Sequence, residues 1–460
     1  MGLIGSQGIL PLGRFLEAVR GVTGPERYWL VPTLSWINSS DGFLHFLCGT
    51  GILFSLAAIL GILRTPSLCL LWLIYLSLVV SGQDFMEFQW DNLLLEAGFL
   101  AILLSLSPAA LWLLGWLLFR LMFSSGFVKL ASGDATWRNL TALNFHYETQ
   151  PLPTWIGWYA HQLPEWMQKF SVSTMFVVEI FVPFLIFGPR RLRLFACAAL
   201  ISLQVLIAAT GNYCFFNLLA VALCLLLIDD ACWPQRLLPK SQTDEGGWRK
   251  WVIVPFAGII LTVSSMLMTH LLGVRLPWPL PMAVLYQVVS PLRSVNGYGL
   301  FAVMTTKRTE IVLEGSRDGV EWKPYEFKWK PGDPKRRPGF VAPHQPRLDW
   351  QMWFAALGTA RQNPWFLHVM ERLLEGSPEV VALLEKNPFP KEPPRYLRAA
   401  SYDYHFTDLA ERRSQGTWWR REREGLYLPT VSLRQEGSPE GFNPVGRKVD
   451  TSMSNQNQDT

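Results

Sequence analysis

The sequence predicts a multi-pass α-helical membrane protein that ends in a soluble α+β domain. Half of its 460 residues are apolar, and only 17% are charged. The charged residues are sparse before about residue 275 and dense after it, and the apolar runs of roughly bilayer length lie in the first part. Past residue 298 the pattern changes to the period of two that is typical of strands.

These changes divide the chain into four parts. They are an external N-terminal segment (1–42), a transmembrane bundle (43–272) with an external loop at 126–170, an external α+β domain (273–434) and a disordered polar tail (435–460). About eight spans are expected in the bundle, at about 43–63, 67–82, 91–107, 108–125, 171–188, 191–209, 212–229 and 251–272. Only Ser107-Pro108 separates the third span from the fourth, which predicts a tight helical hairpin.

Positive charge in the short loops predicts the orientation. The loops after the first, fifth and seventh spans carry Arg64, Arg190, Arg191, Arg193, Arg236, Lys240, Arg249 and Lys250, so we expect them to be cytoplasmic. An external N-terminus has to be exported, yet residues 1–42 contain no signal peptide. We therefore expect either that this segment crosses with the first span or that a further helix precedes it.

Ionisable residues inside the apolar runs are the first candidates for function. Glu96 lies in the third span, where a carboxylate costs about 2–3 kcal/mol. The hairpin turn brings Arg120 to a similar depth, so the sequence predicts a charge-assisted pair. This pair either locks the hairpin or serves as an acid/base site at the outer mouth of the bundle. Asp91 is a further mouth carboxylate, and Glu179 is either another candidate or a hydrogen-bonding residue between helices.

Asp84, Glu87 and Asp91 fall at i, i+3 and i+7, on one helical face if the third span begins early. In that case they would add to the site around Glu96.

The second set of candidates faces the predicted outer compartment. LNFHYETQPLP contributes Asn144, His146, Tyr147 and Glu148, and TGNYCFFNLL contributes Asn212, Tyr213 and Asn217. The first stretch is expected to be a lid over the bundle mouth or a binding surface. Asn212 has the alternative role of capping the next helix. The aromatic segment 154–170 is expected to be an amphipathic interfacial helix.

Several function classes lack support. The six cysteines form no CxxC, and the seven histidines form neither HxH nor HxxxH, so no metal and no disulfide framework is expected. A nucleophile elbow, a P-loop and HExxH are absent, and no cofactor is expected. The net charge of +5 is not concentrated on a folded motif, which argues against nucleic acid as a partner.

In the C-terminal part, YGLFAVM, TEIVLEGS and YEFKWK are expected to be strands, with a hairpin turn at Asp318-Gly319. ERLLEG and EVVALLEK, within 349–386, are expected to be short helices. The arginines Arg336, Arg337, Arg412, Arg413, Arg420 and Arg421 form either solvated edges or a surface for an acidic client.

Six stretches, in order from residue 4 to about 360, resemble the lipase maturation factor family: IGSQGILP, FQWDNLLLEAGFLAILL, LFRLMFSSGFVKLASGDATW, LNFHYETQPLP, TGNYCFFNLL and GFVAPHQPRLDWQMWFAAL. The resemblance implies a multi-pass protein of the endoplasmic reticulum membrane that assists secreted lipases in reaching an active, assembled state. Its partners would be a client protein and membrane lipid. The family also carries a membrane helix before the IGSQGILP-like block, in keeping with the further helix considered above.

The basic, lysine-poor C-terminus looks more like bacterial members, which implies the cytoplasmic membrane instead. A more distant likeness, through the membrane body alone, is to vitamin K-dependent carboxylases. Two functions therefore stay open: a client-binding chaperone, and an intramembrane enzyme that acts on a lipid-like substrate or modifies an exported protein through groups such as Glu96 or His146. We favour the chaperone, because an analogy of fold is weak support for an activity.

Overall fold

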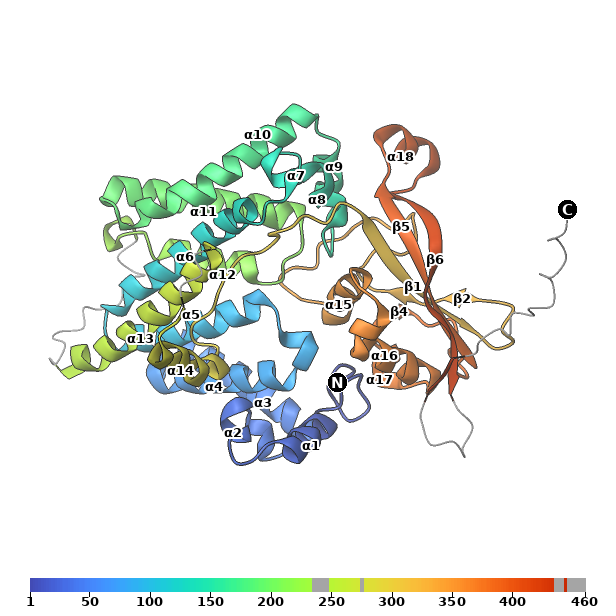
Figure 1. Cartoon of the computed structure of the whole chain (residues 1–460), viewed down its shortest axis with the longest axis horizontal. Coiled ribbons are helices and arrows are strands. Elements are labelled where there is room, and N and C mark those ends of the chain that lie inside the picture. Colours follow the sequence, from blue (N-terminus) through green and yellow to red (C-terminus); the bar gives the residue numbers. More distant parts are fainter. Residues whose placement is uncertain (234–247, 274–276, 434–441, 445–460) are drawn as a thin grey trace, which may run out of the picture.

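The structure is a computed structural model that describes residues 1–233, 248–273, 277–433 and 442–444. It consists of a helical body, on the left in Figure 1, and a domain built on an antiparallel sheet, on the right. The predicted combination of a helical membrane body with a C-terminal α+β domain is confirmed. Of the predicted tail 435–460, only residues 442–444 lie within the described residues.

Each of the eight predicted spans contains a helix. They are α3 (Asp41–Ile59), α4 (Arg64–Ser81), α5 (Gln89–Leu106), α6 (Ala110–Ala131), α10 (Glu165–Phe176) with its continuation to Phe187, α11 (Arg190–Thr210), α12 (Phe216–Leu225) and α13 (Trp248–Leu271). Six of the described helices are long and apolar enough to cross a membrane; α5 and α12 are not among them. The predicted hairpin is present, since α5 ends at Leu106 and α6 begins at Ala110.

The prediction of a full span at 212–229 is wrong. The helix α12 has 10 residues, which gives a length of about 15 Å against a hydrocarbon core of about 30 Å. The chain before it is held in an extended form: Gly211 forms a β-bridge with Pro153, and Asn212 N donates to Leu152 O at 3.3 Å. Contacts with a distant segment therefore delay the start of the helix to Phe216.

The loop between α6 and α10 is folded into short helices: α7 (Ala135–Arg138), α8 (Leu143–Thr149) and α9 (Trp155–His161). The prediction of one amphipathic helix over 154–170 is wrong. Pro164 breaks it, because proline has no N–H and disfavours helical backbone at the preceding residue. The residues from Glu165 onward belong to α10.

The C-terminal domain contains a five-stranded sheet in the order β2-β1-β5-β6-β7, with antiparallel neighbours. The strands are β1 (Arg308–Ser316), β2 (Lys323–Pro324), β5 (Tyr396–Phe406), β6 (Trp419–Leu433) and β7 (Phe442–Pro444), and β3 (Glu326–Phe327) pairs separately with β4 (Leu384–Lys386). The helices are α15 (Arg347–Ala356), α16 (Pro364–Leu374), α17 (Pro378–Val381) and α18 (Leu409–Gln415). In Figure 1, α15, α16 and α17 lie on the side of the sheet that faces the helical body.

The hairpin turn at Asp318-Gly319 is confirmed. Gly319 adopts φ +77°, which glycine permits without strain, and Asp318 Oδ1 accepts hydrogen bonds from the N–H groups of Val320 and Glu321 at 2.8 and 2.9 Å. The side chain and the glycine together fix the connection between β1 and β2.

Three predictions in this domain are wrong in whole or in part. YGLFAVM, residues 298–304, is not a strand, because groups of the helical body take its backbone hydrogen bonds: Gln89 Oε1 accepts from Gly299 N, and Asp134 Oδ2 from Met304 N. EVVALLEK is helical only in α17, and its second half forms β4. YEFKWK is a strand only at Glu326–Phe327.

The first residues of the chain pack on the C-terminal domain. Arg372 Nε of α16 donates to Gly8 O at 2.9 Å, and Ser377 Oγ donates to Gln7 O at 2.9 Å. A Cβ at Gly2 would lie 2.3 Å from Glu379 O, so only glycine allows this approach. The N-terminal segment, which continues into α1 (Leu12–Val22) and α2 (Arg27–Leu30), thus joins the two halves of the molecule.

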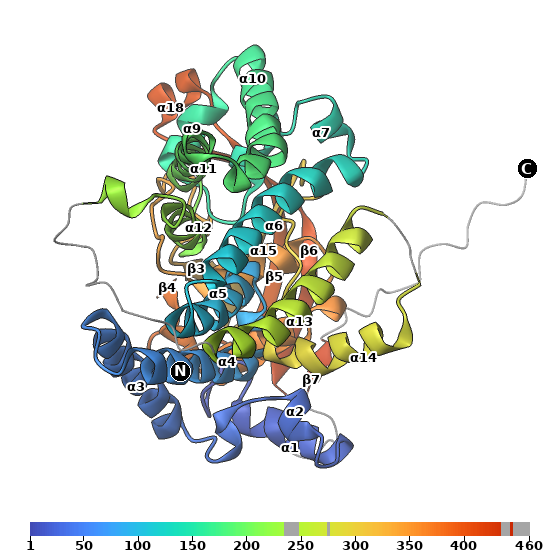
Figure 2. The same ribbon diagram turned by 90° about the vertical axis from the view of Figure 1, so that its left-hand side faces the viewer.

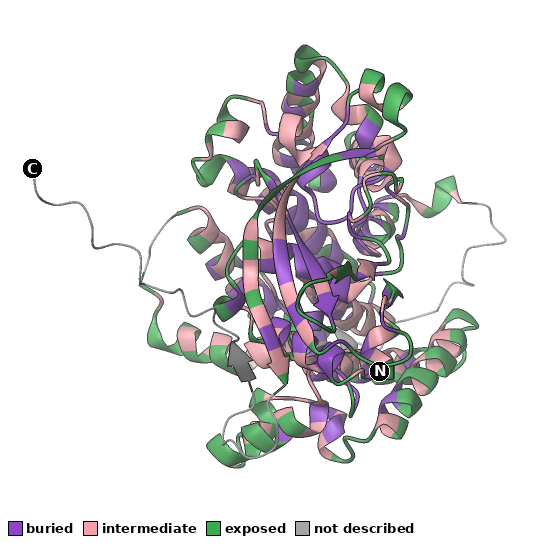
Figure 3. Ribbon diagram, turned by 90° about the vertical axis from the view of Figure 1, so that its right-hand side faces the viewer, coloured by how far each residue is buried: buried purple, intermediate pink, exposed green. Residues whose placement is uncertain are grey.

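The apolar helix α14 (Leu280–Val289) lies outside the predicted bundle, since it follows residue 273. It nevertheless packs beside α13, as Figure 2 also shows, and so belongs with the helical body. In Figure 3, buried residues line the middle strands of the sheet and exposed ones mark the outer helices.

Candidate functional site

Glu96 of α5 and Arg120 of α6 are in contact, and their side chains are 0% and 2% exposed. Arg120 Nη2 donates to Glu96 Oε1, and Arg120 Nη1 donates to Asn296 O at 3.0 Å. Glu96 Oε2 also accepts from Asn296 N at 2.9 Å and from Tyr298 Oη at 2.7 Å. The pair therefore joins the hairpin to the segment that leads from α14 into the sheet domain.

Asp91 is fully buried at the start of α5, but it pairs with Arg347 and not with Arg120. Arg347, the first residue of α15, forms a bidentate pair with it, with Nη1–Oδ2 and Nη2–Oδ1 distances of 2.9 and 2.8 Å. Tyr75 Oη donates to Asp91 Oδ1 at 2.6 Å. The expectation that Asp91 adds to the site of Glu96 is therefore wrong: each carboxylate neutralises its own arginine, and Asp91 joins α5 to the C-terminal domain.

Asp84 and Glu87 do not share a helical face with Asp91. They lie in the turn between α4 and α5, because α5 begins only at Gln89. They belong to a pocket described below.

Glu179 lies in a π-helical turn, Val177–Phe181, that continues α10. Lys129 Nζ of α6 lies 2.6 Å from Glu179 Oε2 and donates to Ser125 O at 3.0 Å. At Gly126 an added Cβ would lie 2.7 Å from the Glu179 Cβ, so the two helices touch at this glycine. The residue therefore pairs with a neighbouring helix, and the wide π turn aims it there.

His146 and Tyr213 are brought together. Tyr213 Oη lies 3.0 Å from His146 Nε2 and donates to Gln150 Oε1 at 2.8 Å, while the imidazole meets the ring of Phe301 edge-on at 4.9 Å. Burial, with a smaller contribution from Lys129, lowers the pKa of His146 to about 4, so the ring is neutral near pH 7. Its Nδ1 is buried and meets no hydrogen-bond partner among the described residues. The helix α8 is packed against the sheet domain, and the role of this stretch as a lid over the bundle mouth or as a binding surface stays a prediction.

Glu148 ties α8 to β5. Its Oε2 accepts from Phe406 N at 2.9 Å, and its Oε1 lies 3.4 Å from His405 Nδ1. Arg308, the first residue of β1, donates to Glu148 O at 2.6 Å and to Pro151 O at 3.0 Å.

Tyr147 is buried in an aromatic cluster with Trp158 and Tyr404. Asn144 is half-buried, and its side chain makes no hydrogen bond to any part of the chain that the structure describes.

Asn212 holds a loop of the C-terminal domain against the helical body. Its Nδ2 donates to Leu152 O at 3.1 Å and to Gly339 O at 2.9 Å, and its Oδ1 accepts from Val341 N at 2.8 Å and Ala342 N at 3.1 Å. All the hydrogen-bonding capacity of the amide is used, so the predicted capping role is wrong.

The cap position of α12 is Phe215, whose side chain makes no capping bond. Asn217, within α12, donates from Nδ2 to Gln204 Oε1 of α11 at 2.8 Å.

Comparison with known proteins places this chain in a family. Residues 1–235 match the model described as the lipase maturation factor transmembrane domain, and residues 294–429 match the lipase maturation factor C-terminal domain. The chain belongs to the lipase maturation factor family. The resemblance seen in the six sequence stretches is confirmed, and the protein is an integral multi-pass membrane protein.

Three relatives illustrate the extent of the similarity. Lipase maturation factor 2 of Gallus gallus is 38% identical, over 94% of this chain and 78% of the relative. Lipase maturation factor 2 of Homo sapiens is 37% identical, over 98% and 83%. Lipase maturation factor 1 of Mus musculus is 36% identical, over 94% and 83%. No solved structure matches the chain.

The two family domains meet along one polar junction, and most of the candidate residues lie on it. Sequence reasoning missed their partners, chiefly Tyr298, Arg308 and Arg347. Arg347 lies in one of the six family stretches, which was a usable signal, whereas nothing in the local pattern marks Arg308 as buried. Among the described residues no group of three or more His, Cys, Asp or Glu is arranged to hold a metal ion.

Proposed function

We propose that this lipase maturation factor homologue is a membrane chaperone that helps an exported lipase, or a similar client, to fold and assemble. The names of its relatives supply the class of client. The main structural support is the junction, where the candidate carboxylates, amides and aromatic hydroxyls join the two domains into one scaffold. This scaffold leaves an exposed part of the C-terminal domain free to bind a client.

The helix α18 is the exposed element that best fits a client. It projects from the sheet at the top of Figure 1 and is well formed, because Asp408 and Glu411 make a capping box and Gly416 ends it in the left-handed conformation. Leu409 and Arg413 lie at i and i+4, so they share a face. Leu409 is 45% exposed, and no described residue pairs with Arg413. An unpaired arginine fits an interface, because arginine is enriched among the residues that carry binding energy, and the exposed leucine beside it adds apolar surface to bury.

The position of α18 next to the helical body adds to the argument. Gln162 Nε2, just past α9, donates to Thr407 O at 3.2 Å, and Trp158 meets Trp418 edge-on at 5.2 Å. A client bound at α18 would therefore rest on a fixed surface beside the membrane helices. The loop charges support placing this surface on the lumenal side of the endoplasmic reticulum membrane, or outside the cytoplasmic membrane of a bacterium.

The test is co-expression with a secreted lipase in cells that lack a maturation factor of their own. Leu409→Ser with Arg413→Gln should lower the yield of active lipase per lipase synthesised about fivefold, the effect of losing about 1 kcal/mol at an interface. The matched control is Val320→Ser with Arg361→Gln, which changes an exposed apolar residue and an exposed arginine elsewhere in the domain. Equal yields with the two variants would exclude α18 as the client surface. An unchanged yield when the whole chain is left out would exclude the chaperone role for that lipase.

A specific observation favours a second function, an enzyme. The buried Nδ1 of His146 has no partner among the described residues, so its lone pair is the free acceptor of the ring, and burial opposes the charge that a proton taken up there would create. If His146 is a catalytic base, His146→Gln should lower activity about 100-fold or more at unchanged membrane level, whereas a chaperone should lose maturation only in part.

A further inference from the structure

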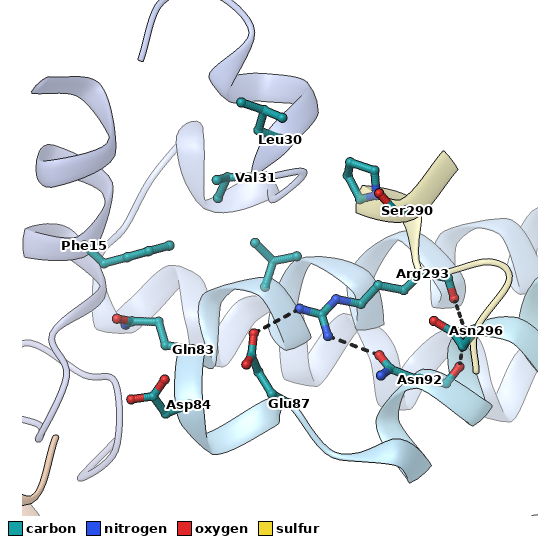
Figure 4. A pocket seen from close by; sticks show the side chains of 12 residues that line it. Phe15, Leu30, Val31, Gln83, Asp84, Glu87, Asn92, Ser290, Arg293 and Asn296 are labelled. Atoms are coloured by element: carbon teal, nitrogen blue, oxygen red, sulfur yellow. Dashed lines mark hydrogen bonds and ion pairs between the residues drawn. The ribbon is translucent and has the colours of Figure 1, made fainter. Parts of the chain in front are cut away.

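A pocket of about 600 Å³ lies at the end of the helical body that adjoins the C-terminal domain, between α1, α2, the α4–α5 turn and the end of α14. Figure 4 shows its charged side chains: Asp84 and Glu87 come from the α4–α5 turn, and Arg293 reaches Glu87 from the segment that follows α14. None of them is part of the domain junction described above. The volume lies within the range of about 300–1,000 Å³ that is usual for small-molecule sites.

The polar side of the pocket carries two carboxylates against one guanidinium. Arg293 Nη1 lies 3.1 Å from Asn92 Oδ1, and its Nη2 lies only 3.4 Å from Glu87 Oε1. The Glu87 side chain is 62% exposed, so it is free to turn away from Arg293. No donor among the described residues reaches the Asp84 carboxylate, and burial together with Glu87 raises its pKa above the usual value. An added cation would therefore be stabilised beside Asp84, and an added anion beside Arg293.

Two residues of the pocket hold unusual backbone conformations. Gln83 and Arg293 adopt φ of +48° and +50°, a left-handed region that is uncommon for residues other than glycine. Gln83 Nε2 donates to Leu10 O at 3.1 Å, which fixes the turn against the N-terminal segment. The charged groups are thus carried by backbone that the surrounding structure holds in place.

The other side of the pocket is apolar. Phe15, Val31 and Val80 line it. Ser290 and Pro291, which directly follow α14, also line the pocket. The helix α14 itself has no charged residue and exposes Leu280, Val284 and Val288, spaced four residues apart on one face.

The helix α2 connects to α14. Trp29 Nε1 donates to Val288 O at 3.1 Å, and Tyr28 and Trp29 are 55% and 45% exposed. Exposed Trp and Tyr are typical of the headgroup level of a bilayer. The pocket therefore lies beside residues of the kind that favour the level where polar headgroups and acyl chains meet.

We propose that this pocket binds the headgroup of a zwitterionic phospholipid. The phosphate lies against Arg293, whose planar guanidinium suits phosphate oxygens, and the ammonium lies between Asp84 and Glu87. The glycerol backbone contacts Phe15 and Val31, and the acyl chains run along the stripe on α14. A lipid held in this way links α2, the α4–α5 turn and α14.

The test uses the full chain purified in mild detergent. Lipids retained by the wild-type protein are measured by native mass spectrometry in competition between phosphatidylethanolamine and phosphatidylglycerol, which carries phosphate but no ammonium. We expect a preference of about tenfold for phosphatidylethanolamine. Asp84→Asn should remove the preference, and Arg293→Gln should weaken the retention of both lipids. Glu17→Gln, at an exposed position of α1, is the matched control and should behave as wild type.

Several outcomes would overturn the proposal. The first is equal retention of the two lipids by the wild-type protein, which needs no variant and so does not depend on whether one folds. The second is an Arg293→Gln variant that matches the Glu17→Gln control. The third is thermal stabilisation by free phosphoethanolamine as large as that by the intact lipid, which would indicate a soluble phosphate compound instead. Because the pocket shares no residue with α18, none of these outcomes bears on the chaperone proposal.

Discussion

The buried pair of Glu96 and Arg120 allows a quantitative test of the helical body. Glu96→Gln leaves the guanidinium of Arg120 buried without its negative partner, and only neutral acceptors remain to it: Asn296 O and the new amide oxygen. An unpaired buried charge costs about 3–5 kcal/mol. We place Glu96→Gln at the upper end of this range, because no negative group is left to offset the charge of Arg120. Arg120→Met leaves the Glu96 carboxylate with the donors of Asn296 and Tyr298, so it belongs at the lower end, about 3 kcal/mol. We therefore expect Glu96→Gln to be the more destabilising change.

The double variant completes the cycle. With both charges gone, the free energy of unfolding should fall by at least about 2 kcal/mol less than the sum of the two single changes. The assay is denaturant unfolding in mixed micelles, followed by the fluorescence of the 21 tryptophans. The control is the exposed pair Glu165 and Lys169, 2.8 Å apart on α10, where the same changes should cost under about 1 kcal/mol.

Two results would refute this reasoning. Single changes that add to within about 0.5 kcal/mol in the double variant would show that Glu96 and Arg120 do not interact. A larger loss from Arg120→Met than from Glu96→Gln would show that Asn296 and Tyr298 do not support the carboxylate.

Three further predictions concern the junction, the buried histidine and the topology. Arg347→Met removes the guanidinium that crosses the junction, so limited proteolysis should release the C-terminal domain several times faster; an unchanged rate would show that the domain is held by other contacts. Burial keeps the pKa of His146 at about 4, below the usual 6.5, so between these two pH values the unfolded chain binds a proton that the folded chain excludes. Stability should therefore fall as the pH drops from about 6.5 towards 4, and a His146→Gln variant with the same slope as wild type would contradict this. Reporters fused after residues 64 and 190 should be cytoplasmic and one after residue 320 should be external, and inverted readings would reverse the orientation.

The sequence predicted those parts of the fold that depend on local composition. Apolar runs located the membrane helices, and Asp318-Gly319 located the hairpin turn, because these signals act through neighbouring residues. The failures share one cause. Residues 298–304 look like a strand and 212–229 look like a span, yet backbone and side-chain groups from distant segments bind both and change their conformation. A periodic pattern carries no information about a partner 60 or 200 residues away.

The same limit explains the candidate site. A binding surface and a domain junction both place amides, carboxylates and aromatic residues on one side of a membrane body, because both need directed hydrogen bonds in partly buried positions. The local sequence around His146 or Asn212 is therefore compatible with either role. The partners Arg308, Gly339 and Val341 decide between them, and these lie in the other domain.

It follows that polar residues fully engaged in the junction are poor places to look for a client or a ligand. A substitution there changes how the two domains are held, and any loss of function is then indirect. The groups that keep free hydrogen-bonding or charge capacity are more informative, because their replacement leaves the scaffold intact. In the described part of the chain these include Arg413 on α18 and Asp84 in the pocket beneath α2, and their separation allows client binding and lipid binding to be tested independently.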